Sequence, residues 1–416
     1  MNETVLVVNL FPRVHGGLVD TLRAHGVRVL TLDRQRLAGI EPPVPSVLSD
    51  DISSAANDAL ASAADEVERV VRRFSDEIVR KATAAGFSDL DEDRLRSRLG
   101  RFLPSAASFA HACAAAIARF EPKLIISGNE FTPESRMAFA LASRSGITSL
   151  HVEHGIRAAY TFLDHHPADV NAVICRESLK RLQGRGGSRQ ALVGNPAWDG
   201  LYRHRAAENP FPKLLPRGLK PVLLAWTWFD PGSSGNYWRS LSEPLRVLEN
   251  CFEMLRARPE YGLVVKLHPL HMHYGFGTSG WFGRKIAESG LGDRIAVVNT
   301  DAEALLRHCF CALVYGSGLG VEAMICGAPA IDIHPRWHDR LFLDRHPVLK
   351  ATEFEELMRL LELLEDEGYR DGYVETMRRL ARDFNYDGDG KAGERLENLV
   401  LYLLGKAPEF KFVDGQ

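Results

Sequence analysis

The chain has 416 residues, of which 45% are hydrophobic and 25% are charged, and its formal net charge is −3. This composition is typical of a soluble globular protein, and the length suggests two domains. The small net charge argues against broad, nonspecific binding of nucleic acid, so we expect no nucleic-acid partner. The six cysteines form no CxxC pair, which favours reduced thiols and a cytoplasmic protein.

The first half of the chain alternates between apolar runs and helical patterns. Residues 4–10 and 27–32 predict strands, and residues 18–26 predict a helix between them, which together make a β-α-β opening. Gly16 and Gly17 stand at the start of that helix. They are either a tight turn or a place where a ligand approaches the backbone, because the full GxGxxG fingerprint is absent.

Residues 41–121 predict a mostly helical insertion to which we assign no chemistry. Pro104 is expected to begin a helix that ends near residue 120, since proline is tolerated in a first turn. The β/α rhythm resumes with a strand at 124–126, a helix at 133–144 and a strand at 148–152. We therefore expect an N-terminal, acceptor-side Rossmann-like domain over residues 1–205.

The second half begins after a charged, proline-containing connection at 203–220. Apolar runs then predict strands at 221–230, 263–267, 295–298, 311–315 and 328–333. These strands alternate with helical patterns, so a second Rossmann-like domain is expected over residues 218–383. The helical segment 384–416 is expected to pack back on the first domain. The predicted fold class is α/β, with two Rossmann-like domains facing a central cleft.

The stretch from 311 to 324 predicts a strand, a small-residue turn and a helix. Gly316, Ser317, Gly318, Leu319 and Gly320 form the turn. A turn of this kind exposes backbone N–H groups beside the positive end of a helix dipole, which suits phosphate. The alternative is that Ser317 is a plain N-cap without a ligand.

Other polar residues are expected at the same edge of the second sheet. Glu322 lies about one turn into the helix, and Lys266 and His268 close the strand before it. His268 either caps a loop or donates to a phosphate. Lys266 is either solvated, paired or part of the site. The carboxylate of Glu322 would be costly to bury without a polar partner.

Two carboxylates are candidates for the chemistry itself. Asp230 follows an apolar and aromatic run, and it is either an Asx-turn residue or a nucleophile. Glu153 ends a strand, and it is either an acid/base or the partner of Arg157 in an ion pair. Glu130 is a weaker rival for the acid/base role. Arg157 could also bind the carboxylate of an acidic sugar, because guanidinium groups bind carboxylates bidentately.

These motifs carry a resemblance to a known family. The pattern Lys266-x-His268-Pro269, with Gly316-Ser317-x-x-Gly320-x-Glu322-Ala323 downstream, resembles the nucleotide-binding half of GT-B glycosyltransferases. Most closely it is similar to the bacterial capsule and lipopolysaccharide Kdo transferases, which are retaining enzymes that use CMP-β-Kdo. The resemblance implies that Asp230, Glu153 and His268 are catalytic and that Glu322 takes the ribose hydroxyls.

If this resemblance holds, the protein moves Kdo or a related acidic sugar from a CMP-sugar to a surface-polysaccharide acceptor, with retention by double displacement. Its partners would then be the nucleotide-sugar donor and a glycan or glycolipid acceptor. Peripheral association with the inner membrane or with polysaccharide assembly proteins is compatible with this function. No cofactor and no metal site are expected, because the spacing of the histidines and acids near 332–339 fits no standard site.

A second resemblance competes with the first. The segment His151-Val152-Glu153-His154-Gly155-Ile156-Arg157 is similar to a signature of non-hydrolysing UDP-N-acetylglucosamine 2-epimerases, which share the GT-B fold. Gly194-Asn195-Pro196 also fits a segment of those enzymes. His154 departs from their pattern, which has a small residue at that place. A catalytically silent nucleotide-sugar-binding protein of polysaccharide assembly is the remaining alternative.

Overall fold

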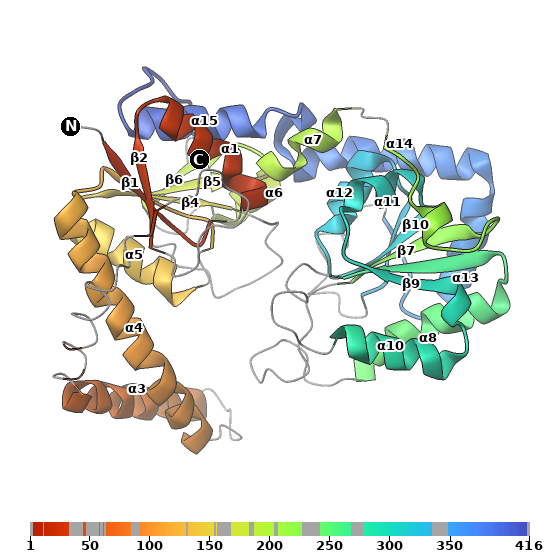
Figure 1. Cartoon of the computed structure of the whole chain (residues 1–416), viewed down its shortest axis with the longest axis horizontal. Helices are drawn as coiled ribbons and strands as arrows, with labels where there is room; N and C mark the ends of the chain where they lie inside the picture. The colour runs from red at the N-terminus through yellow and green to blue at the C-terminus, as the bar shows by residue number, and fades with distance from the viewer. Residues whose placement is uncertain are drawn as a thin grey trace.

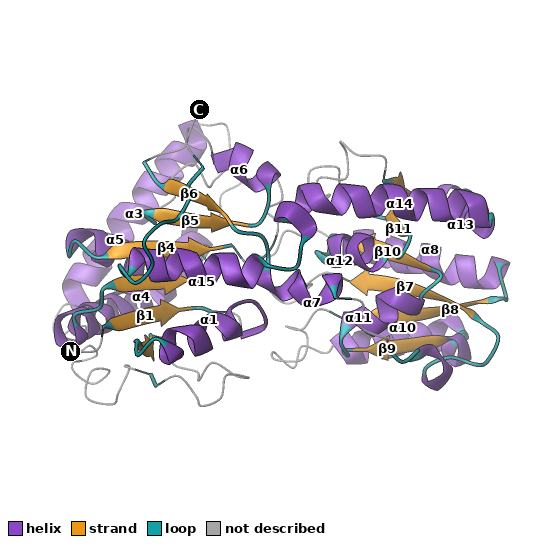
Figure 2. Cartoon of the chain, turned by 90° about the horizontal axis from the view of Figure 1, so that it is seen from above, coloured by secondary structure: helices purple, strands orange, loops and turns teal. Residues whose placement is uncertain are grey.

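The computed structural model describes residues 3–10, 12–32, 45–46, 58, 61, 64–84, 92–129, 132–153, 155, 168–182, 187–203, 207–226, 242–267, 278–334 and 348–413. These residues form two α/β lobes, each built on one parallel sheet of six strands (Figure 1). The expected fold class, two Rossmann-like domains of the GT-B type, is confirmed. Figure 2 shows the strands of the two sheets running toward each other, so their carboxyl edges face one another.

The N-terminal sheet has the strand order β2-β1-β3-β4-β5-β6. Its strands are β1 (Thr4–Val8), β2 (Arg28–Thr31), β3 (Leu124–Ser127), β4 (Thr148–Val152), β5 (Val170–Val173) and β6 (Arg189–Leu192). The strand order reverses between β1 and β3. Both β1 and β3 are buried at every position. Strands covered on both faces are apolar throughout, which is why the sequence shows runs instead of alternation.

Helices cover both faces of this sheet. On one face α1 (Pro12–Ala24) and the late helix α15 (Ala392–Leu403) share a core with β1, β3 and β4. On the other face α4 (Glu92–Phe120) and α5 (Pro133–Arg144) pack on the same strands. The chain also contains α6 (Arg176–Leu182) after β5. The first lobe is therefore closed by a helix that comes from the end of the chain.

The insertion between β2 and β3 contains α3 (Ala64–Ala84) and the long helix α4, which lie against each other (Figure 1). The expected helix start at Pro104 is wrong, because α4 begins at Glu92 and Pro104 lies inside it. An internal proline removes one backbone hydrogen bond of the helix. The packing of α3 and α5 against α4 supports the helix despite that loss.

The C-terminal sheet has the strand order β12-β11-β10-β7-β8-β9. Its strands are β7 (Lys220–Trp226), β8 (Tyr261–Lys266), β9 (Ile295–Val298), β10 (Cys311–Tyr315), β11 (Ala330–Asp332) and β12 (Leu349–Lys350). The chain runs outward from β7 to β9 and then returns to place β10 on the other side of β7. In open α/β sheets ligands bind at the carboxyl ends of the strands that flank such a switch point.

The helices of the second lobe surround this sheet. They are α8 (Ser242–Ala257), α10 (Thr278–Ser289), α11 (Ala302–His308), α12 (Leu319–Cys326), α13 (Phe354–Glu365) and α14 (Glu367–Phe384), with a short 3₁₀ turn η3 (Gly292–Arg294). The core of the lobe also includes Trp198, Leu201, Phe211 and Leu215. These four residues belong to the connection between the sheets, so much of that connection packs on the second lobe.

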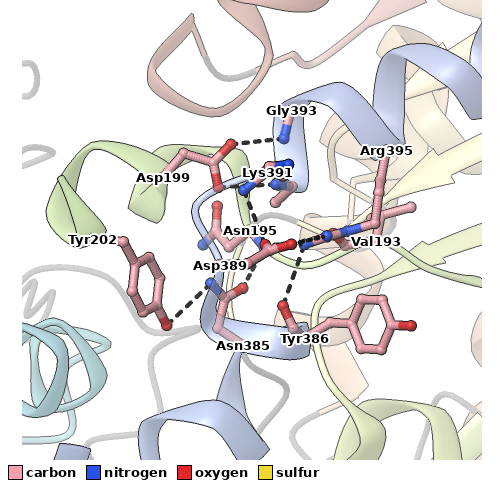
Figure 3. A network of polar contacts seen from close by, with 11 residues as sticks. Val193, Asn195, Asp199, Tyr202, Asn385, Tyr386, Asp389, Lys391, Gly393 and Arg395 are labelled. Atoms are coloured by element: carbon pink, nitrogen blue, oxygen red, sulfur yellow. Dashed lines mark hydrogen bonds and ion pairs between the residues drawn. The ribbon is translucent and has the colours of Figure 1, made fainter.

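The connection is formed by η1 (Pro196–Trp198), α7 (Asp199–Tyr202) and η2 (Phe211–Lys213). The chain crosses back between the lobes after α14, through η6 (Tyr386–Gly388), and then enters α15 (Figure 1). The two crossings lie side by side and are joined by polar contacts (Figure 3). Among the helices of the described ranges, none is both long and apolar enough to cross a membrane.

Asn385 and Asp199 join the two crossings by hydrogen bonds. The Asn385 Oδ1 atom accepts a hydrogen bond from the Asn195 N–H at 2.7 Å, and its Nδ2 group donates to the Tyr202 hydroxyl at 3.4 Å. The Asp199 carboxylate accepts hydrogen bonds from the N–H groups of Ala392 at 3.0 Å and Gly393 at 2.8 Å (Figure 3). Asp199 therefore caps the start of α15 from the other crossing.

Arg395 ties the same helix to both crossings. Its guanidinium donates to the two oxygens of Asp389 at 2.8 and 3.0 Å and to the Val193 carbonyl at 2.8 Å (Figure 3). The Arg395 hydrogen bonds hold the pKa of Asp389 below its usual value. These contacts explain the Asp387–Gly390 segment as a structural turn.

Candidate functional site

The switch point of the second sheet lies between β7 and β10, and the turn that follows β10 is the small-residue turn singled out from the sequence. Gly316 has φ of +59°, a left-handed conformation that favours glycine. Ser317 is buried, whereas Gly318 is exposed. The chain then enters α12, with Gly318 as its N-cap residue. The turn thus stands at the edge where an α/β sheet binds ligands.

Hydrogen bonds within the turn limit which N–H groups a ligand could use. The Leu319 N–H donates to Ser317 Oγ at 3.3 Å, and the Gly320 N–H donates to the Ser317 carbonyl at 3.1 Å. Within the described part of the chain, the Gly318 N–H has no hydrogen-bond partner. The exposed amide of Gly318 and the dipole of α12 are therefore what the turn offers to an anion.

Glu322 lies in the first turn of α12, and only 7% of its surface is exposed. Its Oε1 atom accepts a hydrogen bond from the indole Nε1–H of Trp198 at 3.3 Å. Trp198 is itself buried and comes from the connection between the lobes. The buried carboxylate was expected to have a polar partner, and one such partner is Trp198, which the sequence did not suggest.

Lys266 is the last residue of β8 and is 6% exposed. Its ammonium donates to the Leu267 carbonyl at 2.8 Å and to Asn299 Oδ1 at 3.2 Å. Burial and these contacts exclude a merely solvated lysine. Its charge lies on the strand next to β7, close to the switch point.

Aromatic side chains pack against one another beneath the same edge of the sheet. Trp226, at the end of β7, is fully buried against Phe282 and Tyr315, with ring centroids 5.0 and 4.9 Å away. Tyr315 also stacks on His334 at 4.9 Å, and the His334 N–H donates to Asp332 Oδ1 at 3.0 Å. This packing places Trp226 in the core beneath the edge.

Glu153 follows β4 in the first lobe and is 2% exposed. Its Oε2 atom accepts a hydrogen bond from the Ile174 N–H at 2.8 Å, and its Oε1 atom accepts one from the Ser178 hydroxyl at 2.8 Å. The carboxyl group therefore supports the chain where it enters α6. Burial raises the pKa of the neighbouring Cys175 thiol to about 11, with the Glu153 charge adding to the effect, so this thiol is not a nucleophile at neutral pH.

Several expected site residues lie outside the described residues. These are Asp230, His268 and Arg157, together with the weaker candidate Glu130. The candidate residues that the structure describes are therefore Lys266, the turn 316–320 and Glu322 in the second lobe, and Glu153 in the first. Within the described ranges, no group of three or more His, Cys, Asp or Glu side chains could hold a metal ion.

The first lobe has a polar cluster at its own switch point that sequence reasoning missed. Asn9 follows β1 with φ of +50°, and its Nδ2 group donates to Thr132 Oγ1 at 2.7 Å and to Ser135 Oγ at 3.1 Å. The Ser127 hydroxyl donates to Ser135 Oγ at 2.7 Å. The only sequence signal was an asparagine directly after a buried strand, a residue type that tolerates the left-handed region.

Comparison with known proteins places this architecture among GT-B-type folds. No family model matches the chain, and no curated protein sequence matches it. Solved structures do match over nearly the full length. The UDP-N-acetylglucosamine 2-epimerase from Rickettsia bellii is 15% identical, with a TM-score of 0.59 over 97% of this chain and 98% of that one.

Two further structures show the breadth of the likeness. The UDP-GlcNAc 2-epimerase from Neisseria meningitidis, solved with UDP-GlcNAc, is 13% identical, with a TM-score of 0.55 over 97% of this chain and all (100%) of that one. Sucrose-phosphate synthase from Thermosynechococcus elongatus is 14% identical, with a TM-score of 0.54 over 98% and 100%. At these identities the likeness establishes the fold. It gives no support to the specific expectation of a CMP-Kdo transferase.

Proposed function

We propose that the protein is an enzyme acting on a nucleoside diphosphate sugar, of the kind that inverts the C2 carbon of a UDP-linked N-acetylamino sugar. The observation that carries this proposal is the turn 316–320 at the switch point, with the buried carboxylate of Glu322 one helical turn behind it. The epimerases of the same fold support the choice of a UDP-sugar. The similarity of residues 151–157 to a signature of those epimerases supports epimerisation as the reaction.

In this proposal the second lobe binds the nucleotide. The Gly318 amide and the dipole of α12 bind a phosphate, and the positive charge of Lys266 lowers the cost of bringing the anion there. Glu322 accepts hydrogen bonds from the ribose hydroxyls, because a carboxylate is an acceptor and a hydroxyl is a donor. Arg157 binds a further anionic group of the substrate from the first lobe.

Inversion at C2 requires that a C–H bond is broken and re-formed on the opposite face of the sugar ring. Such a reaction needs acid/base groups on the two faces. Glu153, Asp230 and His268 are the residues that we propose for these roles. No metal or cofactor is assigned to the reaction.

The test is incubation of the purified protein with UDP-N-acetylglucosamine in D₂O, followed by proton NMR. We expect a second UDP-sugar with inverted configuration at C2, and deuterium at C2 in both sugars, because the proton must exchange during inversion. A spectrum that stays that of UDP-N-acetylglucosamine, without deuterium at C2, would contradict the epimerase proposal.

Glycosyl transfer is the second candidate, and the match to a synthase of the same fold favours keeping it. In this form Asp230 attacks the anomeric carbon of a CMP-linked acidic sugar such as Kdo, and CMP leaves. A surface-glycan hydroxyl, which gives its proton to Glu153, then displaces the aspartate with net retention. Release of more than one equivalent of CMP per enzyme from CMP-Kdo only when a glycan acceptor is present would favour transfer over epimerisation. A protein that binds nucleotide sugars without turnover would show neither reaction.

Glu153→Gln separates a catalytic from a structural role of this residue. The glutamine oxygen can still accept a hydrogen bond from the Ile174 N–H. The glutamine NH₂ group can donate to Ser178 Oγ, so the direction of that hydrogen bond is reversed. We therefore expect the melting temperature to change by less than about 3 °C. An acid/base cannot be replaced by an amide, so turnover should fall at least about 100-fold. Unchanged turnover in this variant would remove Glu153 from the mechanism and leave it a purely structural role.

A further inference from the structure

Trp198 connects the candidate nucleotide site to the crossing between the lobes. It is 4% exposed, and its ring belongs to the hydrophobic core of the second lobe. Its indole N–H donates to Glu322 Oε1 at 3.3 Å, across 124 positions of sequence. The partner is a carboxylate at the switch-point edge of the sheet, so this hydrogen bond reaches directly into the proposed site.

The backbone around Trp198 is fixed on both sides. Before it, the Asn195 N–H donates to Asn385 Oδ1 at 2.7 Å, and Asn195 Oδ1 accepts from the Ala197 N–H at 3.0 Å. After it, Asp199 caps α15 through Ala392 and Gly393. Trp198 therefore lies between two residues, Asn195 and Asp199, that are hydrogen-bonded to the returning crossing.

The segment is also anchored to the second lobe beyond α7. Arg307 donates to the Leu201 carbonyl at 2.9 Å, and it is held by Glu303 at 2.8 Å on the same helix. The indole N–H is thus held in place from the crossing on one side and from α11 on the other. A donor fixed in this way can hold a carboxylate in one orientation.

A carboxylate has about four acceptor positions, and one indole N–H fills only one of them. Fixing one oxygen removes the rotation of the Glu322 side chain, whose ordering would otherwise cost free energy on ligand binding. The carboxylate is then presented in one orientation at the edge of the sheet, and this orientation decides how it meets the ribose hydroxyls.

We propose that Trp198 is a positioning residue, which orients Glu322 for the ribose hydroxyls and couples nucleotide binding to the crossing between the lobes. This inference rests on the proposed nucleotide site. It predicts that the effect of Trp198 on binding depends on whether the ribose hydroxyls are present. A purely structural role would weaken every nucleotide equally.

The experiment compares UDP with 2′-deoxy-UDP by isothermal titration calorimetry. In the wild-type protein we expect UDP to bind about 10-fold more tightly, because a hydrogen bond to a charged group is worth roughly that ratio. In Trp198→Phe, which keeps the aromatic ring and removes the N–H group, the ratio should fall to about 2-fold. The affinity for 2′-deoxy-UDP should change by less than about 2-fold.

Trp226→Phe is the matched control. Trp226 is buried in the same lobe, and within the described part of the chain its indole N–H has no hydrogen-bond partner. The control should therefore retain the wild-type ratio between the two nucleotides. If Trp198→Phe does not fold, the ¹⁵N-labelled indole N–H signal of Trp198 in the wild-type protein gives the answer: it should shift with UDP and shift clearly less with 2′-deoxy-UDP.

The outcomes separate this inference from the proposed function. A wild-type protein that binds UDP with a clear ribose preference, together with a Trp198→Phe variant that keeps the same ratio, would overturn the role of Trp198 alone. Equal indole shifts with both nucleotides would do the same. A wild-type protein that binds neither nucleotide would overturn the nucleotide site itself, and with it this inference.

Discussion

Replacing Gly194 with alanine is expected to lower the free energy of unfolding by about 3 kcal/mol. Gly194 has φ of +90°, and a Cβ atom there would lie 2.9 Å from the Ala392 Cβ and 3.0 Å from Asn385 Oδ1. Both neighbours belong to the crossing between α14 and α15. The substitution would therefore combine backbone strain with a clash at the place where the two lobes are joined.

Gly146→Ala provides the matched control. Gly146 also has a positive φ, +67°, but nothing lies within 4 Å of the position of its Cβ. Gly146→Ala should lower the free energy of unfolding only by the strain of a left-handed alanine, about 1 kcal/mol. Urea unfolding of both variants, followed by circular dichroism, measures the difference. Equal losses in the two variants would show that the crossing at Gly194 is not tightly packed.

Glu322→Ala is expected to weaken UDP binding by at least about 30-fold. The substitution removes the acceptor of the ribose hydroxyls, and hydrogen bonds to a charged group contribute roughly 1.5–3 kcal/mol. It also leaves the buried Trp198 N–H without its partner, which lowers stability by about 1–3 kcal/mol. Calorimetric titration with UDP measures the first effect, and thermal unfolding without ligand measures the second.

Glu365→Ala is the control for this prediction. Glu365 is a carboxylate of the same lobe that forms an ion pair with Lys220 and accepts a hydrogen bond from the Tyr261 hydroxyl at 2.5 Å. Lys220 and Tyr261 begin β7 and β8, so this carboxylate lies at the amino edge of the sheet, opposite the proposed site. Its removal should lower stability and leave UDP affinity unchanged. Similar losses of affinity in both variants would contradict the placement of the nucleotide beside Glu322.

Local sequence patterns were sufficient to predict the central strands of both sheets and the turn beside the site, but not the two-residue edge strand β12. The strands β8 and β10 are buried at every position, so their apolar runs could be recognised without knowing their neighbours. The helix α5 was also predictable, because Thr132 caps it and Pro133 fills its first turn. The turn at Gly316–Gly320 was visible because its small residues are adjacent in sequence.

Contacts between distant segments were not predictable in this way. The Trp198–Glu322 hydrogen bond joins residues 124 positions apart, and the Asn195–Asn385 bond joins residues 190 positions apart. The periodicity of one segment carries no information about which other segment it meets. The described contacts of the Glu153 oxygens, with Ile174 and Ser178, were not suggested by the sequence either, and Arg157, its suggested partner, lies outside the described residues.

The central claim is that the carboxyl edge between β7 and β10 binds a uridine nucleotide. The most direct test is a thermal-shift panel of CMP, CDP, UDP and GDP with the wild-type protein, since a ligand that binds only the folded state raises its melting temperature. We predict that UDP gives the largest increase and that the increase is lost in Glu322→Ala. A larger increase with CMP, or none with any of the four nucleotides, would contradict the account.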